Sequence, residues 1–370
     1  MAGASDRRVW RLAFPVILSN LSVPLLGAVD TAVMGHLPDP AYIGGVAVGA
    51  LVFSYIYWGF GFLRMGTTGL VAQANGARDR GEMRAIFLRG LLVAGTIGAV
   101  VIALQVPVAA IALSLVDASP KVEALARRYY DIRVWSAPAA LMQYVVIGWL
   151  FGVQRMGSAL ALTVFANALN IVLDLWFVLG LGWGIDGVAG ATLIAEWSAA
   201  LLGLALVGRR VVLGERGAAR VFDGARLVRM LRINGDIFIR TLCLVTAFAW
   251  FTAKGAGMGD VLLAANAVLL NFQTFMAYGL DGFAHAAEAL VGSAIGARDR
   301  GAFREAVMTS TKWSALIALG FAAVYLGAGG ALIRTLTGIE AVRASAAIFL
   351  PWAIASPLVS VWSFQLDGIF

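Results

Sequence analysis

Long apolar runs alternate along this chain with short breaks that carry charged and turn-forming residues. A helix needs about 20 predominantly apolar residues to cross a bilayer, and ten runs reach that length. They lie at about 12–34, 43–74, 86–115, 128–153, 157–181, 187–208, 229–253, 261–295, 307–333 and 345–370. This pattern predicts an all-α polytopic membrane protein with about ten transmembrane helices.

Composition excludes most soluble classes of protein. Of the 370 residues, 61% are hydrophobic and 13% are charged, whereas a soluble domain has about 45–50% apolar and about 25% charged residues. Such a chain could not cover a soluble surface with polar groups. The single cysteine also excludes an intramolecular disulfide. We therefore set aside soluble enzymes, DNA-binding domains and secreted disulfide scaffolds.

Arginine supplies almost all of the net charge of +7, and it concentrates in alternate breaks. The arginine-rich breaks are the N-terminus, about 75–85, the break at Arg155, 209–228 and about 296–306. Because cytoplasmic loops carry the excess of basic residues, this alternation predicts a cytoplasmic N-terminus. The charge is thus explained by membrane topology, and no nucleic-acid partner is expected.

One segment occurs twice. Residues 70–81 and 290–301 are identical at nine of twelve positions, 220 residues apart, and both contain Gly-Ala-Arg-Asp-Arg-Gly. The motif alone could simply end a helix at the inner membrane face, but its recurrence indicates duplication. Six spans separate the copies, so the halves have the same orientation, which is a parallel repeat.

The repeat predicts two lobes of six helices. We place an N-lobe with spans one to six at 1–213, an inter-lobe cytoplasmic loop at 214–228, and a C-lobe at 229–370. The C-lobe then holds only spans seven to ten, and the chain stops on apolar residues. We therefore expect that about ten of twelve helices are present and that the last two are absent.

Charged and polar residues inside spans are costly, at about 2.5–3.5 kcal/mol for each charge. In the N-terminal half they are Asp30 in span one, Asn170 and Asp174 in span five, and Thr192 in span six. Asn170 and Asp174 are four residues apart and share a helix face. This set could bind Na⁺, especially at Asp30, Asn170 and Asp174, or hold a proton. Alternatively, it forms an interhelical hydrogen-bond network that only packs the bundle.

The C-terminal half has a second set. Asp281, His285 and Glu288 share one stripe of span eight, and Asp367 lies in span ten. We consider a proton relay, a substrate contact or a neutralised structural network. Asp236 and Arg240, four residues apart in span seven, are predicted to form a structural ion pair.

Several chemistries are missing from the sequence. No lysine stands in a Gly-Lys-Ser/Thr motif, and no His-Glu-x-x-His motif occurs, so neither a nucleotide-binding loop nor that type of zinc site is predicted. One histidine between two acids has too few ligands for a metal site. We expect no enzyme activity and no cofactor other than a coupling ion, H⁺ or Na⁺. The one metal ion considered is Na⁺ at Asp30, Asn170 and Asp174.

Six stretches together resemble the multidrug and toxic compound extrusion (MATE) family, specifically its DinF branch. The resemblance extends in order over essentially the whole chain. The stretches are 13–20, 29–37, the two Gly-Ala-Arg-Asp-Arg-Gly loops, 167–174 and 281–288.

The resemblance implies two six-helix lobes around a central cavity, and export of cationic or amphipathic compounds in exchange for Na⁺ or H⁺. It implies an N-lobe cation site at Asp30, Asn170, Asp174 and Thr192, with a tyrosine of span four that matches Tyr129. The seventh-span glutamate of the NorM branch has no counterpart, because Asp236 and Arg240 occupy that span.

From these features we expect a monomeric antiporter in the bacterial inner membrane, with small molecules and membrane lipid as its partners. A flippase for lipid-linked precursors or polysaccharides is the alternative within transport, although only Arg64, Arg133 and Arg240 lie mid-span to meet a diphosphate. A membrane-embedded lipid enzyme and an inactive fragment are the remaining alternatives.

Overall fold

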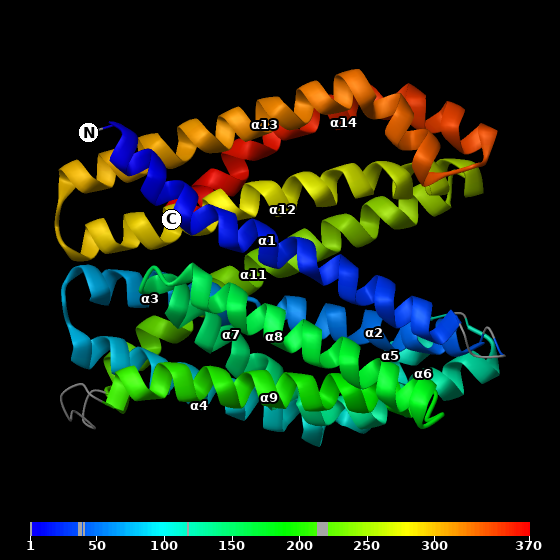
Figure 1. Cartoon of the computed structure of the whole chain (residues 1–370), viewed down its shortest axis with the longest axis horizontal. Helices are drawn as coiled ribbons and strands as arrows, with labels where there is room; N and C mark the ends of the chain where they lie inside the picture. Colours follow the sequence, from blue (N-terminus) through cyan, green and yellow to red (C-terminus); the bar gives the residue numbers. More distant parts are fainter. Residues whose placement is uncertain (1, 36–38, 40, 117, 213–220) are drawn as a thin grey trace. The chain divides into compact units, whose positions relative to one another are not determined.

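The computed structural model describes residues 2–35, 39, 41–116, 118–212 and 221–370, and every regular element in these ranges is a helix (Figure 1). Nine helical stretches of this described part are long and apolar enough to cross a membrane. The first predicted span corresponds to one more helix, α1, which has 34 residues. The prediction of an all-α polytopic bundle is confirmed.

Each predicted span matches one helix or a run of consecutive helices. The bounds are α1 Ala2–Gly35, α2 Ala41–Gly59, α3 Phe62–Gly76, α4 Arg80–Ala103, α5 Gln105–Ser114, α6 Pro120–Arg133, η1 Val134–Ser136, α7 Ala137–Gly152, α8 Met156–Asp174, η2 Leu175–Gly180, α9 Ile185–Val212, α11 Gly224–Ala256, α12 Asp260–Gly296, α13 Arg300–Leu336 and α14 Glu340–Ile369.

Three of the predicted spans contain an internal break. Span two divides into α2 and α3 near Gly61, and span three divides into α4 and α5 at Leu104. Between α6 and α7 the chain makes the short 3₁₀ turn η1, and Pro138 then lies in the first turn of α7. Proline is tolerated there because its missing N–H would have no helical partner.

Contacts divide the chain into two compact units. Unit 1 consists of Met1–Ile17 together with Ile239–Phe370, and unit 2 is Leu18–Phe238. The divisions therefore fall inside α1 and α11. The predicted lobes, 1–213 and 229–370, remain a prediction, and residues 214–220 of the predicted inter-lobe loop lie outside the described residues.

Within unit 2, small residues bring helices into close contact. A Cβ atom added to Gly148 of α7 would lie 2.5 Å from the backbone oxygen of Arg64 in α3. One added to Gly98 of α4 would lie 2.6 Å from Cα of Pro138. Only glycine permits these approaches, so the many glycines of the apolar runs pack helices directly against each other.

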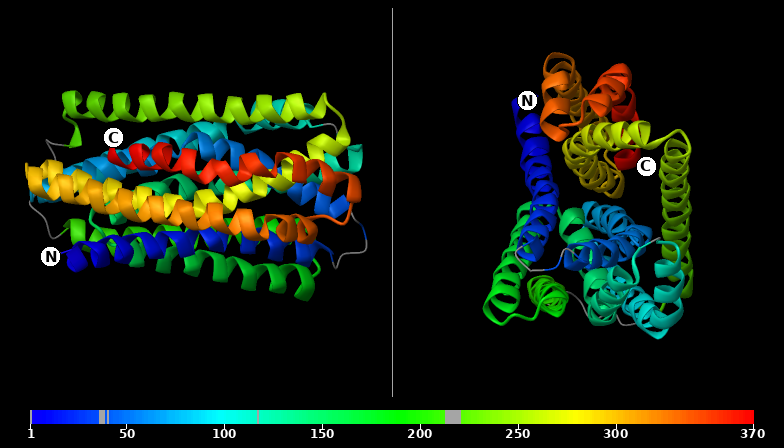
Figure 2. Two further views of the ribbon diagram at one scale, coloured as in Figure 1. Left: turned by 90° about the horizontal axis from the view of Figure 1, so that it is seen from above. Right: turned by 90° about the vertical axis from the view of Figure 1, so that its right-hand side faces the viewer.

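In unit 1, α12, α13 and α14 run side by side, as Figure 1 and both views of Figure 2 show. Buried aromatic and aliphatic side chains fill the space between them. Tyr325 of α13 donates its hydroxyl hydrogen to the carbonyl oxygen of Phe272 in α12 at 2.6 Å, and the two rings lie 4.8 Å apart. A buried hydroxyl group is thereby satisfied.

The two copies of the repeated motif adopt the same turn. Arg78 and Arg298 both have positive φ, 57° and 55°, and end their helices in the left-handed conformation. The next residue, Asp79 or Asp299, accepts a 2.9 Å hydrogen bond from the backbone N–H three residues on and so caps the following helix. The shared geometry agrees with duplication.

Candidate functional site

Two carboxyl groups meet inside unit 2. Asp30 comes from α1, and Asp174 is the last residue of α8. Their side chains lie within hydrogen-bonding reach of each other. Asp174 is fully buried, and within the described residues one oxygen of each carboxyl group has no hydrogen-bond partner. Two carboxylates this close repel each other unless a proton or a cation lies between them.

Asn170 and Thr192 complete the oxygen-rich wall of this site. Asn170 lies one helical turn before Asp174, and Thr192 comes from the neighbouring helix α9; both are buried. In the amide orientation that satisfies its neighbours, Asn170 donates to Oδ2 of Asp174 at 3.3 Å and accepts from the backbone N–H of Thr192 at 3.0 Å. The structure thus brings together the four polar residues that the sequence singled out.

The backbone changes where Asp174 lies. Directly after it, Leu175–Gly180 forms the π-helical segment η2. Such wide turns are rare and occur frequently at functional sites, because they interrupt the regular pattern of helical hydrogen bonds. The polar site therefore coincides with a local irregularity in the fifth span.

Tyr129 is also buried, and its contacts reveal a part of the site that the sequence analysis missed. Arg133 donates to the Tyr129 hydroxyl at 2.9 Å and forms an ion pair with Glu196 at 3.4 Å. Its guanidinium group stacks over the ring of Phe53 at 4.8 Å. The positive charge of Arg133 also interacts electrostatically with the Asp30 carboxyl group. Glu196 carried a visible signal, an acidic residue within the predicted span 187–208, but its arginine partner lies on another helix.

A second polar network lies in unit 1. His285 Nδ1 and Glu288 Oε2 are 3.1 Å apart on α12. Arg240 of α11 forms an ion pair with Asp367 of α14, and its charge also interacts with Asp281 and Glu288. Of the four residues that the sequence assigned to a C-lobe relay or substrate contact, Asp281, Glu288 and Asp367 interact with Arg240, and His285 joins them through Glu288.

The Asp236–Arg240 pair remains a prediction. The structure shows an ion pair of Arg240 with Asp367, and the side chain of Asp236 is exposed. Spacing along one helix identifies neighbours on that helix only. It could not reveal that Gly368 lets α14 lie directly against the α12 backbone at Ala284, which brings Asp367 close to this network.

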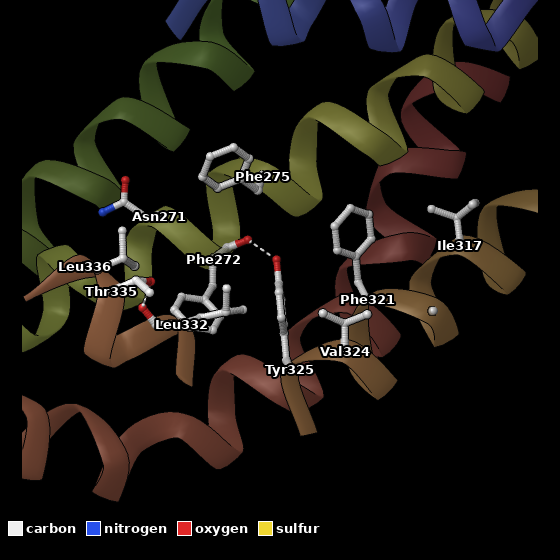
Figure 3. Close-up of a pocket in the computed structure, with 11 residues that line it drawn as sticks. Asn271, Phe272, Phe275, Ile317, Phe321, Val324, Tyr325, Leu332, Thr335 and Leu336 are labelled. Carbon is white, nitrogen blue, oxygen red and sulfur yellow. Dashed lines mark hydrogen bonds between the residues drawn. The ribbon is translucent and has the colours of Figure 1, made fainter. Parts of the chain in front are cut away.

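An apolar pocket in unit 1 lies between α12 and α13 and has a volume of about 540 Å³ (Figure 3). Aromatic and aliphatic side chains dominate its lining. The Tyr325 hydroxyl donates its hydrogen bond to the Phe272 carbonyl oxygen. Its lining includes Phe272, Phe275, Phe321, Val324, Tyr325 and Leu332. The lining residues carry no charge, so this pocket offers apolar contact and no ion chemistry.

A helical bundle with apolar spans and buried carboxyl groups inside it is the architecture of a polytopic membrane carrier. The model of the MatE family matches residues 15–176 and 237–370. The chain belongs to this family of multidrug and toxic compound extrusion transporters.

Individual relatives agree with this assignment. The chain is 43% identical to DNA damage-inducible protein F of Escherichia coli, over 99% of this chain and 80% of that protein. It is 30% identical to the probable multidrug resistance protein NorM of Caulobacter vibrioides, over 86% of this chain and 67% of that protein.

The fold agrees as well. A solved structure described as the outward-facing conformation of a multidrug resistance MATE family transporter superposes with a TM-score of 0.87 at 19% identity. The alignment covers 99% of this chain and 82% of the other. The protein is thus a multi-pass membrane protein of a transporter family. Its family membership excludes the alternative of a membrane-embedded lipid enzyme.

Proposed function

We propose that this protein is a secondary efflux transporter that exports cationic or amphipathic compounds in exchange for H⁺ or Na⁺. The observation that carries the proposal is the contact between Asp30 and Asp174 inside the spans. The names of the relatives support the same function: the NorM relative is described as a probable multidrug resistance protein. No further cofactor is needed, because the ion gradient supplies the energy.

The carboxyl pair would take up the coupling ion. A proton shared between Asp30 and Asp174, or a Na⁺ ion bound by these carboxylates with Asn170, removes the repulsion of two adjacent negative charges. Oxygen ligands of this type suit a hard cation. Thr192 fixes the Asn170 amide, and Tyr129 connects the site to Arg133 and Glu196.

Exchange requires that the ion and the exported compound oppose each other. The ion must bind more tightly to the conformation that binds the compound less tightly, because a ligand shifts an equilibrium only by its differential affinity. We propose that the network of Asp281, His285, Glu288 and Asp367 around Arg240 serves as a proton relay or substrate contact in the C-lobe.

Two of the three mid-span arginines do not favour the flippase alternative. A diphosphate would need positive charge that is available to it, but Arg133 is paired with Glu196, and Arg240 is paired with Asp367. We place the protein in the bacterial inner membrane as a monomer, with a cytoplasmic N-terminus, an N-lobe at 1–213 and a C-lobe at 229–370.

Substitution of one carboxyl group tests the proposal. Asp30→Asn keeps the size of the side chain but removes its charge and its titration, so efflux of ethidium or norfloxacin from cells should be abolished. Asp131→Asn is the matched control, since Asp131 is exposed and, among the described residues, forms its ion pair with Arg127 of the same helix. Undiminished efflux by Asp30→Asn, at equal expression, would contradict ion coupling through the Asp30 carboxyl group.

A further inference from the structure

The first helix of each half of the chain passes from one compact unit into the other. In α1 the division falls after Ile17, and in α11 it falls after Phe238. The N-terminal half of α1 therefore packs with the second half of the chain, and the N-terminal part of α11 packs with the first half. The two exchanged segments are residues 2–17 and 224–238.

Glycine allows each exchanged segment to lie very close to its host. On Gly282 of α12, an added Cβ atom would lie 2.8 Å from the Ala13 backbone oxygen in α1. Gly66 of α3 allows the same close approach to α11. An added Cβ atom on Gly66 would have the buried side chain of Asn234 as its nearest neighbour. Both segments are thus seated on a host helix of the opposite half.

A polar contact holds the start of the α1 segment. Asp6 accepts hydrogen bonds from Lys312 Nζ at 2.5 Å and from Trp313 Nε1 at 2.8 Å, both on α13. Trp10, one turn further along α1, packs edge-on against Trp313 with ring centroids 5.3 Å apart. Ser5 adds a hydrogen bond to Glu305.

A polar contact of the opposite polarity holds the start of the α11 segment. Arg226 pairs with Glu82 of α4, and the same carboxylate pairs with Arg89 at 2.7 Å. Asp223 caps the start of α11 and also contacts the Arg226 guanidinium at 3.2 Å. Arg89 is only 2% exposed, so Glu82 is fixed in place by its buried partner.

These contacts are related by the repeat. Asp6 and Arg226 are 220 residues apart, the same separation as the two copies of the duplicated loop. Each lies near the start of the first helix of its half, and each pairs with the helix that follows the duplicated loop of the other half. In one contact the first helix supplies the acid, and in the other it supplies the base.

We infer that Asp6–Lys312 and Arg226–Glu82 are twin latches that hold the exchanged halves of α1 and α11 on their host helices and set the balance between transport conformations. A partly exposed ion pair is weak, so such a contact can break and re-form during a cycle. The four residues are positioning residues, and their effect on the transport rate rests on the proposed function.

Distance measurements test the latches independently of transport. In the full chain with Cys243→Ser, spin labels are placed at exposed positions, Gly3 with Arg304 for the first latch and Arg229 with Arg80 for the second. Double electron–electron resonance then reports each separation. Lys312→Gln should broaden the first distribution, and Arg226→Gln should broaden the second. The variant Arg226→Gln leaves the Glu82–Arg89 pair intact.

Conservative variants separate charge from packing. Lys312→Arg and Arg226→Lys should restore the narrow distributions, and Glu340→Gln, which neutralises an exposed acid elsewhere, should leave them unchanged. Efflux should change about twofold to fivefold in the two glutamine variants, the size expected for a partly exposed ion pair, and return to normal in the conservative ones.

Unchanged distance distributions in both glutamine variants would overturn the latches. Broadening that the conservative variants fail to reverse would also overturn them, because packing would then explain the effect. If Asp30→Asn leaves efflux intact, the proposed function fails. The spin-label distances in the glutamine variants still show whether the two ion pairs hold the helix segments in place. If the distances change but the efflux rate does not, the latches have no role in transport and the inference fails.

Discussion

At the scale of single residues, the proposed coupling site centres on partly buried Asp30 and fully buried Asp174. The Asn170 amide already donates to Asp174 and accepts from the backbone N–H of Thr192. The site is therefore pre-organised, and the remaining variable is what lies between the two carboxyl groups. That explains why the removal of one charge should have a large effect on coupling.

Asp6 offers a test at the same scale, outside the spans. Its hydrogen bonds from Lys312 and Trp313 lower the pKa of the Asp6 carboxyl below the ordinary value of an aspartic acid. A carboxyl group with a lowered pKa in the folded state stabilises that state above its unfolded pKa, and the contribution is lost as the pH falls through the folded pKa.

We therefore expect Asp6→Asn to lower the thermal unfolding temperature at pH 6. The difference from the wild type should shrink below about pH 4, where the unfolded carboxyl begins to hold its proton. Unfolding curves of the detergent-solubilised protein over a pH series provide the measurement, with Glu340→Gln as control. A difference that stays constant down to acidic pH would contradict the charge-based contact.

The sequence predicted most of the polar site but not its pairing. Asp30, Asn170, Asp174 and Thr192 stand out because polar groups are rare in apolar runs. The ion pairs Arg133–Glu196 and Arg240–Asp367 join different helices. Spacing along one helix contains no information about which helix packs against it, so those partners required the structure.

At the scale of the helices, close packing depends on glycines that accept no side chain. Gly148→Ala would place a Cβ atom 2.5 Å from the backbone oxygen of Arg64. Because backbone cannot move aside cheaply, we expect a destabilisation of about 1–3 kcal/mol. Gly157→Ala is the control, since nothing lies within 4 Å of its added Cβ atom.

Thermal unfolding of the two variants in detergent, with retention on size exclusion, measures the effect. Gly148→Ala should unfold at a clearly lower temperature than the wild type, and Gly157→Ala should not. Equal stability of the two variants would mean that α3 and α7 can separate without cost, contrary to the packing described.

The apolar pattern predicted the spans well because membrane helices require long uninterrupted hydrophobic runs. It did not predict the break between α2 and α3 or the π-helical segment after Asp174. Both irregularities keep the side chains apolar and change only the hydrogen-bond pattern of the backbone. Hydropathy is insensitive to that change.

On the scale of the whole molecule, duplication was visible in the sequence, but the exchange of helix segments was not. A boundary in the polar loop at 214–228 is the natural prediction, whereas contacts divide the chain inside α1 and α11. The exchange depends on long-range contacts such as Asp6 with Lys312, 306 residues apart. No local pattern encodes contacts of that range.

The central claim is that ion binding at Asp30 and Asp174 drives export, and transport by the purified protein in proteoliposomes tests it most directly. An imposed gradient of H⁺, or of Na⁺ at constant pH, is applied, and the movement of ethidium against its own gradient is followed. We predict uphill ethidium transport with one of the two gradients, and none with either gradient in Asp30→Asn. Transport that ignores both gradients, or that continues in Asp30→Asn, would contradict the claim.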